Sequence, residues 1–268
     1  MSFGLGAAVL LGVVVTGCPP GPSAPSRGPQ PPRQRAFGAG ASITHAESGV
    51  SLAMVPSGVY MLGGSAGTAS TRSAIRISLN AFYLGVHEVT NEQYVRVMGR
   101  RPAAMDRPMA VGARSHPVSM VTWLEAIEFC GRTGLRLPTE DEWEAAARGQ
   151  DGRRFPWGDT LPSHAQSNIH GVGLTPHGPS DVGSYTGDVS PFGMYDMGGN
   201  VSEWVSTEWS DMGSGAPGRL RVYKGGSWNT THASPLYRNP LGEGRFGVAL
   251  GFRVACDALT TDELENPR

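Results

Sequence analysis

Charged residues are scarce in this sequence, and the two signs nearly cancel. Lysine and arginine contribute 22 residues and aspartate and glutamate 23, which leaves a formal net charge of -1 over 268 residues. Such a chain offers no general attraction to nucleic acid or to an anionic membrane surface. Cysteine is rarer still: only Cys18, Cys130 and Cys256 occur, with none between the last two. The apolar run at residues 3–15 is too short to span a bilayer as a helix.

The N-terminal segment has the features of an export signal. Its apolar run is followed by the sequence Thr-Gly-Cys18, which resembles a bacterial lipobox. In such signals the cysteine receives lipid and becomes the mature N-terminus, so we expect residues 1–18 to be a lipoprotein signal peptide and Cys18 to be the lipidation site. No lysine or arginine precedes the run, and the alternative interpretation is a short buried helix. The signal predicts an exported lipoprotein in the periplasm or on the cell surface, which contacts the membrane through its lipid anchor alone.

Glycine and proline indicate the domain boundaries. The chain holds 38 Gly and 21 Pro, more than a helical protein carries, while 39% hydrophobic residues still allow a sizeable core. Proline is dense after Cys18, so residues 19–45 are expected to be an extended, solvated tether. Residues 46–257 then form one folded domain, and residues 258–268 a polar tail.

Capping signatures and turn residues predict the secondary structure. Three Thr-x-x-Glu/Gln motifs mark the starts of helices, at Thr90 with Gln93, Thr122 with Glu125, and Thr139 with Glu142. Gly134 and Gly149 are expected to end the second and third helices. Short strands are expected at residues 59–62, 75–84, 222–224 and 249–256. The pattern indicates an α+β domain with few long elements.

Eight separated blocks of sequence follow one another between Met54 and Arg253. They are Met54-Val-Pro-Ser-Gly58, Glu88-Val-Thr-Asn91, His116-Pro-Val118, Arg136-Leu-Pro-Thr-Glu140 with Glu142-Trp-Glu144 and Arg148-Gly149, Phe155-Pro-Trp-Gly158, Asp196-Met-Gly-Gly-Asn-Val-Ser-Glu-Trp204, Gly225-Gly-Ser227, and Gly251-Phe-Arg253. In this order the blocks resemble the formylglycine-generating enzymes, the sulfatase-modifying factor family. The resemblance implies that family's fold, which is related to C-type lectins and has few short helices, many short strands and Gly-rich loops. Function must still be argued from the site.

The resemblance also places the family's active-site strand at Gly225 to Thr230. In the family a cysteine stands at the position of Thr230 and a second at that of Pro235, and the pair holds the copper(I) used to oxidise a substrate cysteine with dioxygen. Soft thiolates suit this ion, and a threonine hydroxyl does not replace them. Thr230 and Pro235 are therefore degenerate catalytic positions. We expect no bound copper and no formylglycine-generating activity.

The altered segment still carries polar and aromatic side chains of the kind found in binding loops. The expected binding residues are Ser227, Trp228, Asn229, Thr230, His232, Tyr237 and Arg238. Taken singly, Ser227 and Trp228 are equally typical of turn and packing residues. The sequence predicts a non-catalytic binding module for a peptide, protein or glycan, with no nucleic-acid partner. Two alternatives are a metal-dependent oxidoreductase of the family that uses non-cysteine ligands and acts on a protein cysteine or another substrate, and a true sulfatase-maturing enzyme.

The resemblance implies a structural calcium site as well. The family wraps Ca²⁺ with side chains at the positions of Asp196 and Glu203 and with backbone carbonyls at those of Gly199 and Val201. All four donors are oxygens, which a hard cation prefers. The alternative is that Asp196 caps a turn and Glu203 forms a surface ion pair.

Family members often carry a cysteine at the position of Cys130 and another just after the Gly-Phe-Arg triplet, sometimes two residues earlier than Cys256. With Cys18 lipidated, these two thiols are left in an oxidising compartment, where thiols tend to pair. We therefore expect a Cys130–Cys256 disulfide, and the alternative is two buried free thiols.

Overall fold

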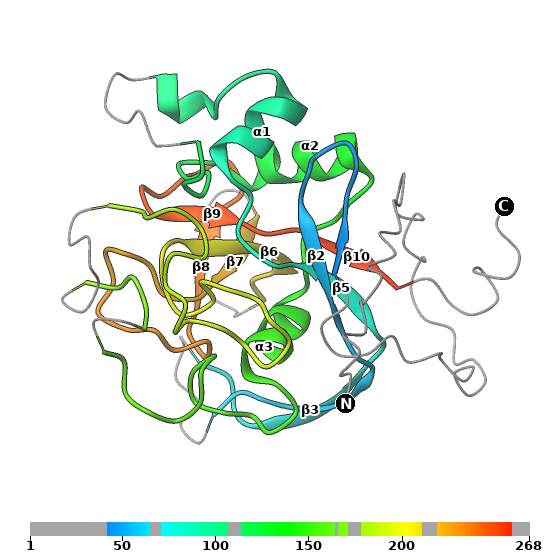
Figure 1. Cartoon of the computed structure of the whole chain (residues 1–268), viewed down its shortest axis with the longest axis vertical. Helices are drawn as coiled ribbons and strands as arrows, with labels where there is room; N and C mark the ends of the chain where they lie inside the picture. Colours follow the sequence, from blue (N-terminus) through cyan, green and yellow to red (C-terminus); the bar gives the residue numbers. More distant parts are fainter. Residues whose placement is uncertain are drawn as a thin grey trace, which may run out of the picture.

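The computed structural model describes residues 42–64, 71–106, 114–163, 166–170, 178–210 and 219–258. Within them, short helices and strands are joined by long loops (Figure 1). The expected signal peptide with Cys18, the tether up to residue 41 and the tail from residue 259 lie outside these residues. In the described part of the chain, no helix has the length and apolar character needed to cross a membrane.

The helices begin where their capping signatures predict. They are α1 (Asn91–Met98), the 3₁₀ helix η1 (Ala103–Asp106), α2 (Trp123–Thr133) and α3 (Glu140–Arg148). Each α-helix opens with a complete capping box, in which the threonine hydroxyl accepts the N3 backbone N–H and the N3 side chain reaches back to the cap. Gly134 and Gly149 follow α2 and α3 with φ of 68° and 67°, a region that favours glycine. Each cap contributes about 1 kcal/mol, so local sequence fixes the helix starts.

Within the described residues, the strands form two four-stranded sheets and a hairpin. The first sheet is antiparallel, in the order β1 (Ser42–Thr44), β2 (Ser51–Val55), β5 (Phe82–Gly85) and β10 (Ala255–Asp257). The hairpin pairs β3 (Gly58–Leu62) with β4 (Ile75–Leu79). The second sheet has the order β8 (Arg238–Gly242), β7 (Leu220–Lys224), β6 (Ser202–Glu208) and β9 (Leu250–Phe252), with β6 and β9 parallel.

Two expected strands are each divided between different sheets. Residues 75–84 separate into β4 and β5, and residues 249–256 into β9 and β10. The second division occurs at Arg253 and Val254, where the Arg253 guanidinium donates to the Gly85 carbonyl and the Gly85 N–H donates to the Val254 carbonyl. These long-range hydrogen bonds fix the point at which the chain passes from one sheet to the other. The hydrophobic alternation within residues 249–256 does not predict them, because it depends on that segment alone.

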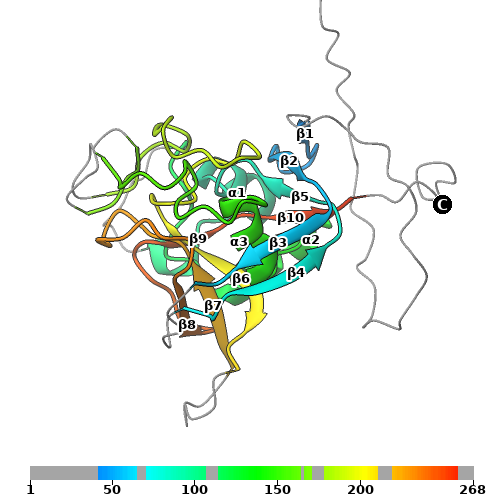
Figure 2. The ribbon, with the colours of Figure 1, turned by 90° about the horizontal axis from the view of Figure 1, so that it is seen from below.

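The core consists of two main apolar clusters. The first packs α1 and α2 on β9 through Tyr94, Phe129 and Phe252, whose ring centroids lie 5.3 to 6.4 Å apart. The second surrounds α3, which contacts β3, β6 and β7 and contributes the fully buried Trp143. Figure 2 shows α3 within the fold, close to these strands. Burial of each large side chain contributes about 1.5–3 kcal/mol, which holds the long loops on a rigid frame.

Candidate functional site

The altered segment is a loop closed by neighbouring strands. It runs from residue 225 to residue 237, between β7 and β8, and the residues that flank it, Lys224 and Arg238, are direct cross-strand partners. Two cations opposite each other repel, and α3 supplies the compensating charge. Glu140 lies 3.6 Å from Lys224 Nζ and 2.9 Å from Arg238 Nε. The base of the loop is therefore held to α3 by buried charge pairs.

Lys224 is fully buried, and its main partner is Glu144, 3.0 Å away. Burial opposes ionisation of Glu144, but Lys224 and the Gly63 N–H favour the carboxylate and hold its pKa below the ordinary value. Arg148, one turn further along α3, pairs with the same carboxylate at 2.9 Å. The part of α3 around Glu144 and Arg148 thus holds Lys224, at the base of the altered loop, through buried ion pairs.

Thr230 has a structural role in this loop. Its hydroxyl accepts the Ser227 N–H at 2.8 Å and lies 3.0 Å from the Ser227 carbonyl and 3.2 Å from the His232 carbonyl. The Ser227 hydroxyl in turn donates to the Asn229 side chain at 2.8 Å. Pro235, the second degenerate position, is buried. The Thr230 hydroxyl is thus engaged in backbone hydrogen bonds.

A pocket of about 530 Å³ opens beside the loop. Its lining residues are Gly64, Thr71, Arg154, Phe155, Leu161, Pro162, Thr231, His232, Ala233, Ser234, Leu236 and Tyr237. The His232 and Tyr237 rings stack with centroids 4.0 Å apart, and the Arg154 guanidinium lies 5.1 Å from the Phe155 centroid. Burial lowers the pKa of His232, so its imidazole is neutral at neutral pH. These described lining residues combine aromatic faces, aliphatic groups, hydroxyls and one cation, and none of them carries a carboxylate.

Only two of the seven predicted binding residues line this pocket. His232 and Tyr237 line it, while Ser227, Asn229 and Thr230 form the adjoining turn. Trp228 is not among the lining residues, and its backbone N–H donates to the Asn200 carbonyl at 2.9 Å.

Arg238 belongs to a second pocket of about 410 Å³. There it pairs with Glu140 and lies 4.2 Å from the Trp209 ring centroid, near Arg72 and Glu208. Four hydroxyl residues complete the lining: Thr71, Ser73, Thr207 and Ser210. Thr71 lines both pockets, so they adjoin.

The expected calcium segment is a tight, buried turn at the start of β6. Asp196 and Asn200 have φ of 60° and 64°, and a Cβ at Gly199 would lie 2.4 Å from Ser167 Oγ. This conformation requires the short polar residues and the glycine found there. Asp196 Oδ2 accepts the Gly183 N–H at 2.6 Å.

Glu203 is paired with a buried arginine in this arrangement. Its oxygens accept Arg253 Nε and Nη2 at 2.6 and 2.7 Å, and Trp143 Nε1 donates to it at 2.7 Å. An ionised carboxylate offers about four lone-pair sites, so three hydrogen bonds leave Glu203 with one free. The alternative of a surface ion pair is wrong, because both Glu203 and Arg253 are fully buried.

Glu88 and Asp188 add two more buried carboxyl groups beside Asp196 and Glu203. Burial together with the Asp196 charge raises the pKa of Asp188 to about 8, and burial raises that of Asp196 to about 6. The pKa of Glu88 is raised well above its usual range by burial, Asp196 and Glu203. Among the described residues, Arg253 is the cation that interacts with this group, so carboxyl groups are in excess over cations.

This excess and the oxygen-only donors fit a hard cation. In the described residues, no group of three or more His, Cys, Asp or Glu side chains is arranged to hold a metal ion. A calcium site here would therefore rest on Asp196, Glu203 and the carbonyls of Gly199 and Val201. Copper(I) does not fit the degenerate site, where Thr230 and Pro235 provide no thiolate.

The expected Cys130–Cys256 disulfide is wrong, because Cys130 is a free, buried thiol on α2. Both residues belong to the apolar cluster beneath α1 and α2. A two-residue offset along a strand keeps the face but moves a side chain by about 7 Å. A disulfide needs Cβ atoms about 3.5–4.5 Å apart. A cysteine two residues further along the strand, on the same face, is therefore not within bonding distance of the same partner. Burial raises the pKa of Cys130 to about 12, which makes this thiol unreactive.

Sequence reasoning missed several residues that build the site. Four of them occur in the sequence blocks, but the blocks do not predict that their side chains are buried: Glu88, Glu140, Glu144 and Arg253. Asp188 and Leu161 lie outside every block and gave no signal. Leu161 lines the first pocket and is 67% exposed.

Comparisons with known proteins agree with the fold. The chain is 30% identical over 239 residues to a serine/threonine-protein kinase pkn1 of Chlamydia caviae, covering 76% of this chain and 37% of that protein. It is 34% identical to the formylglycine-generating enzyme of Mus musculus, covering 55% of this chain and 46% of that protein. The chain thus spans less than half the length of these curated relatives.

Among solved structures, Treponema denticola variable protein 1 superposes with a TM-score of 0.65 at 25% identity, covering 78% of this chain and 95% of that chain. Residues 42–258 match the model of the sulfatase-modifying factor enzyme 1-like domain. The chain therefore belongs to the sulfatase-modifying factor family, whose domain occupies the described fold from β1 to β10.

Proposed function

We propose that this domain is a non-catalytic binding module that has kept the family's scaffold without its copper chemistry. The main support for this proposal is the hydrogen bonding of Thr230. Its hydroxyl bonds to backbone atoms of Ser227 and His232. Pro235 supplies neither a thiolate nor a proton. Two soft ligands are thus replaced by a turn residue and a buried ring.

The pocket beside the loop is the proposed binding site. Aromatic faces from His232 and Tyr237 offer flat contact area, and Leu161 and Leu236 offer aliphatic contact. Hydroxyls and the Arg154 guanidinium supply hydrogen bonds at the same surface. These groups suit a peptide, protein or glycan that presents both an apolar face and hydrogen-bonding groups.

The first test separates binding from catalysis. The purified chain is loaded with copper(I), and oxygen consumption is followed with a cysteine-containing sulfatase peptide. We expect no retained copper and no oxygen uptake. Turnover with copper would support a sulfatase-maturing enzyme, and turnover with another metal would support an oxidoreductase with non-cysteine ligands; either result contradicts the proposal.

The second test measures binding on peptide and glycan arrays. We expect Tyr237→Ala to weaken any array ligand about tenfold, since an interfacial aromatic commonly contributes 1–2 kcal/mol or more. Arg76→Ala on the exposed β4 is the matched surface control and should bind as the wild type. Equal binding by Tyr237→Ala would place the binding surface elsewhere.

We also propose that Ca²⁺ binds at Asp196, Gly199, Val201 and Glu203. The support is the excess of buried carboxyl groups over the single Arg253 cation. Saturating calcium at 100 times its Kd should add about 2.7 kcal/mol to the free energy of unfolding and raise the melting temperature. Asp196→Asn and Glu203→Ala should abolish this rise, whatever their effect on the apo protein. An unchanged melting temperature after chelation would exclude a structural calcium.

The proposed location is a membrane, reached through lipid on Cys18. The support is the sequence of residues 1–18, with its apolar run and Thr-Gly-Cys ending. Expression with a labelled fatty acid should mark the wild type and not Cys18→Ser, and Cys18→Ser should leave the membrane fraction. A labelled Cys18→Ser variant would contradict the assignment.

A further inference from the structure

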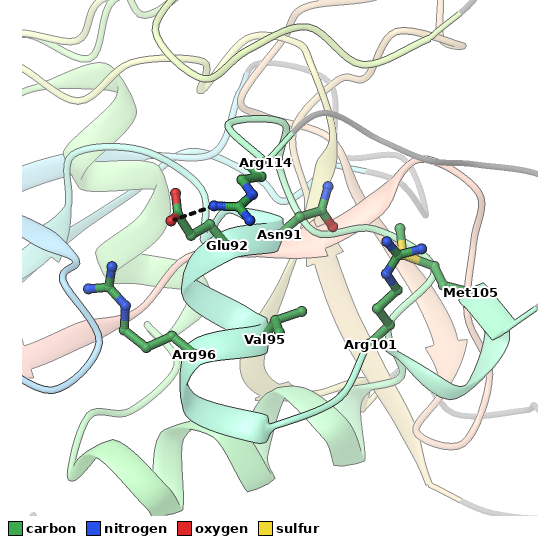
Figure 3. Close-up of a pocket in the computed structure, with 7 residues that line it drawn as sticks. All are labelled: Asn91, Glu92, Val95, Arg96, Arg101, Met105 and Arg114. Carbon is green, nitrogen blue, oxygen red and sulfur yellow. Dashed lines mark ion pairs between the residues drawn. The ribbon is translucent and has the colours of Figure 1, made fainter.

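A basic pocket lies beside α1 and η1, away from the altered loop. It has a volume of about 380 Å³, and Figure 3 shows its side chains arranged around the exposed face of α1. The lining residues are Asn91, Glu92, Val95, Arg96, Arg101, Met105 and Arg114. None of them lines either pocket near the altered loop. Three arginines and one glutamate line the pocket, although the whole chain carries a formal net charge of -1. Figure 3 shows Arg114 beside Glu92, with Arg96 and Arg101 on opposite sides of α1.

The carboxylate does not neutralise the pocket. Glu92 lies 3.7 Å from Arg114, and their side chains are 50% and 85% exposed. Such an exposed pair is weak and readily exchanged for another anion. No ion pair to Arg96 or Arg101 occurs within the described residues.

The backbone on both sides of Arg101 is anchored to α2. Arg100, the preceding residue, pairs with Glu125 at 3.1 Å, and the Ala103 N–H donates to the same carboxylate at 2.9 Å. Pro102 between them is buried. The segment is thus fixed to α2 on one side, while Arg101 is exposed on the pocket side.

Arg96 is positioned against the turn that precedes β2. A Cβ at Gly49 would lie 2.5 Å from Arg96 Nη1, so the guanidinium rests on the glycine backbone. Gln93 Nε2 donates to the Gly49 carbonyl at 3.0 Å and holds the turn to α1. Arg96 is exposed, so its planar guanidinium is accessible to a carboxylate, which it can bind through two parallel hydrogen bonds.

The backbone amides at the start of α1 are already used. The Asn91 N–H donates to the His116 carbonyl at 3.0 Å and the Glu92 N–H to the Arg114 carbonyl at 3.1 Å. Anion recognition therefore falls to the arginine side chains. Between them, Val95 is 41% exposed and Met105 also lines the pocket, which adds an apolar contact.

We propose that this pocket docks an acidic polypeptide segment of a partner protein, with an apolar side chain between its carboxylates. Separated guanidinium groups match carboxylates spaced along a chain, and bidentate pairing suits this geometry. The apolar side chain would rest on Val95 and Met105. Because the site shares no residue with the proposed binding pocket, its test is independent of that proposal.

The experiment uses the full chain and a fluorescein-labelled heptapeptide, Gly-Asp-Glu-Leu-Glu-Asp-Gly, with blocked ends. Its binding is followed by fluorescence anisotropy. We expect Arg96→Ala/Arg101→Ala to weaken binding about tenfold or more, and Arg76→Ala on β4 to bind within about twofold of the wild type. Raising NaCl from about 50 to about 300 mM should weaken binding several-fold, since exposed charges are screened. Replacing the peptide's leucine with glycine should also weaken it.

Three results would contradict the docking of an acidic polypeptide segment. Equal binding of the Asn/Gln version of the peptide, or wild-type binding by the double arginine variant, would overturn the proposal. Complete displacement by about 10 mM phosphate would assign the pocket to small anions rather than to a polypeptide. Circular dichroism of the double variant should match the wild type, because both arginines are exposed.

Discussion

Replacement of Arg253 by methionine is the most informative single perturbation of this fold. Arg253 is fully buried, donates twice to Glu203, and also donates to the carbonyls of Gly85 and Tyr195 at 2.9 Å. Its removal leaves the Glu203 carboxylate without its buried cation and takes one donor from each of the two carbonyls. Breaking one side of a buried ion pair costs about 3–5 kcal/mol, because the remaining charge stays desolvated.

Urea unfolding followed by tryptophan fluorescence measures this change. With a slope of about 1–3 kcal/mol/M, Arg253→Met should lower the unfolding midpoint by 1 M or more. Arg132→Met is a matched control, since Arg132 forms an exposed i,i+4 pair with Glu128 at 2.7 Å. That exposed pair contributes only about 0.3–0.5 kcal/mol.

A second variant tests the cause. Arg253→Met/Glu203→Gln removes the orphaned charge and should recover part of the lost stability. The reasoning is refuted if Arg253→Met stays within about 1 kcal/mol of the wild type, or if the added Glu203→Gln destabilises it further.

Three further predictions concern single side chains. Burial lowers the pKa of His45 below its ordinary 6.5, so the unfolded state binds a proton before the folded state does, and the free energy of unfolding falls as the pH drops below that value. His45→Gln should reduce this loss of stability at acidic pH, as measured by thermal melts over a series of pH values. Thr230→Val removes the acceptor of the Ser227 N–H and should cost about 1–3 kcal/mol in urea unfolding, with Thr230→Ser close to the wild type. Cys130 should resist a thiol reagent at pH 8 in the folded domain and react fully in guanidinium, whereas rapid labelling of the native protein would contradict its burial.

Local features of the fold were readable from the sequence. The capping motifs at Thr90, Thr122 and Thr139 gave the three helix starts, because a cap involves residues only three positions apart. The divided strands and the Cys130 pairing were not readable. The strand division and the cysteine pairing both depend on contacts between segments far apart in the sequence. One such contact is the hydrogen bond from Arg253 to the Gly85 carbonyl.

The candidate site shows the same contrast. His232 and Tyr237 were named from their chemistry and do line the pocket. Arg238 was placed with them but lies in the adjoining pocket, because it begins β8 and is held there by Glu140 and the Trp209 ring. Leu161 and Arg154 come from a separate loop, so no spacing rule joins them to His232.

The sequence by itself determined what this chain lacks. With no cysteine between Cys130 and Cys256, it has no thiolate pair at positions 230 and 235, in any fold. Only the tertiary structure decided how the remaining groups are used. Folding brings Glu88, Asp196 and Glu203 around Arg253 and engages the Thr230 hydroxyl in a turn, because burial and hydrogen bonding depend on segments that meet only in space.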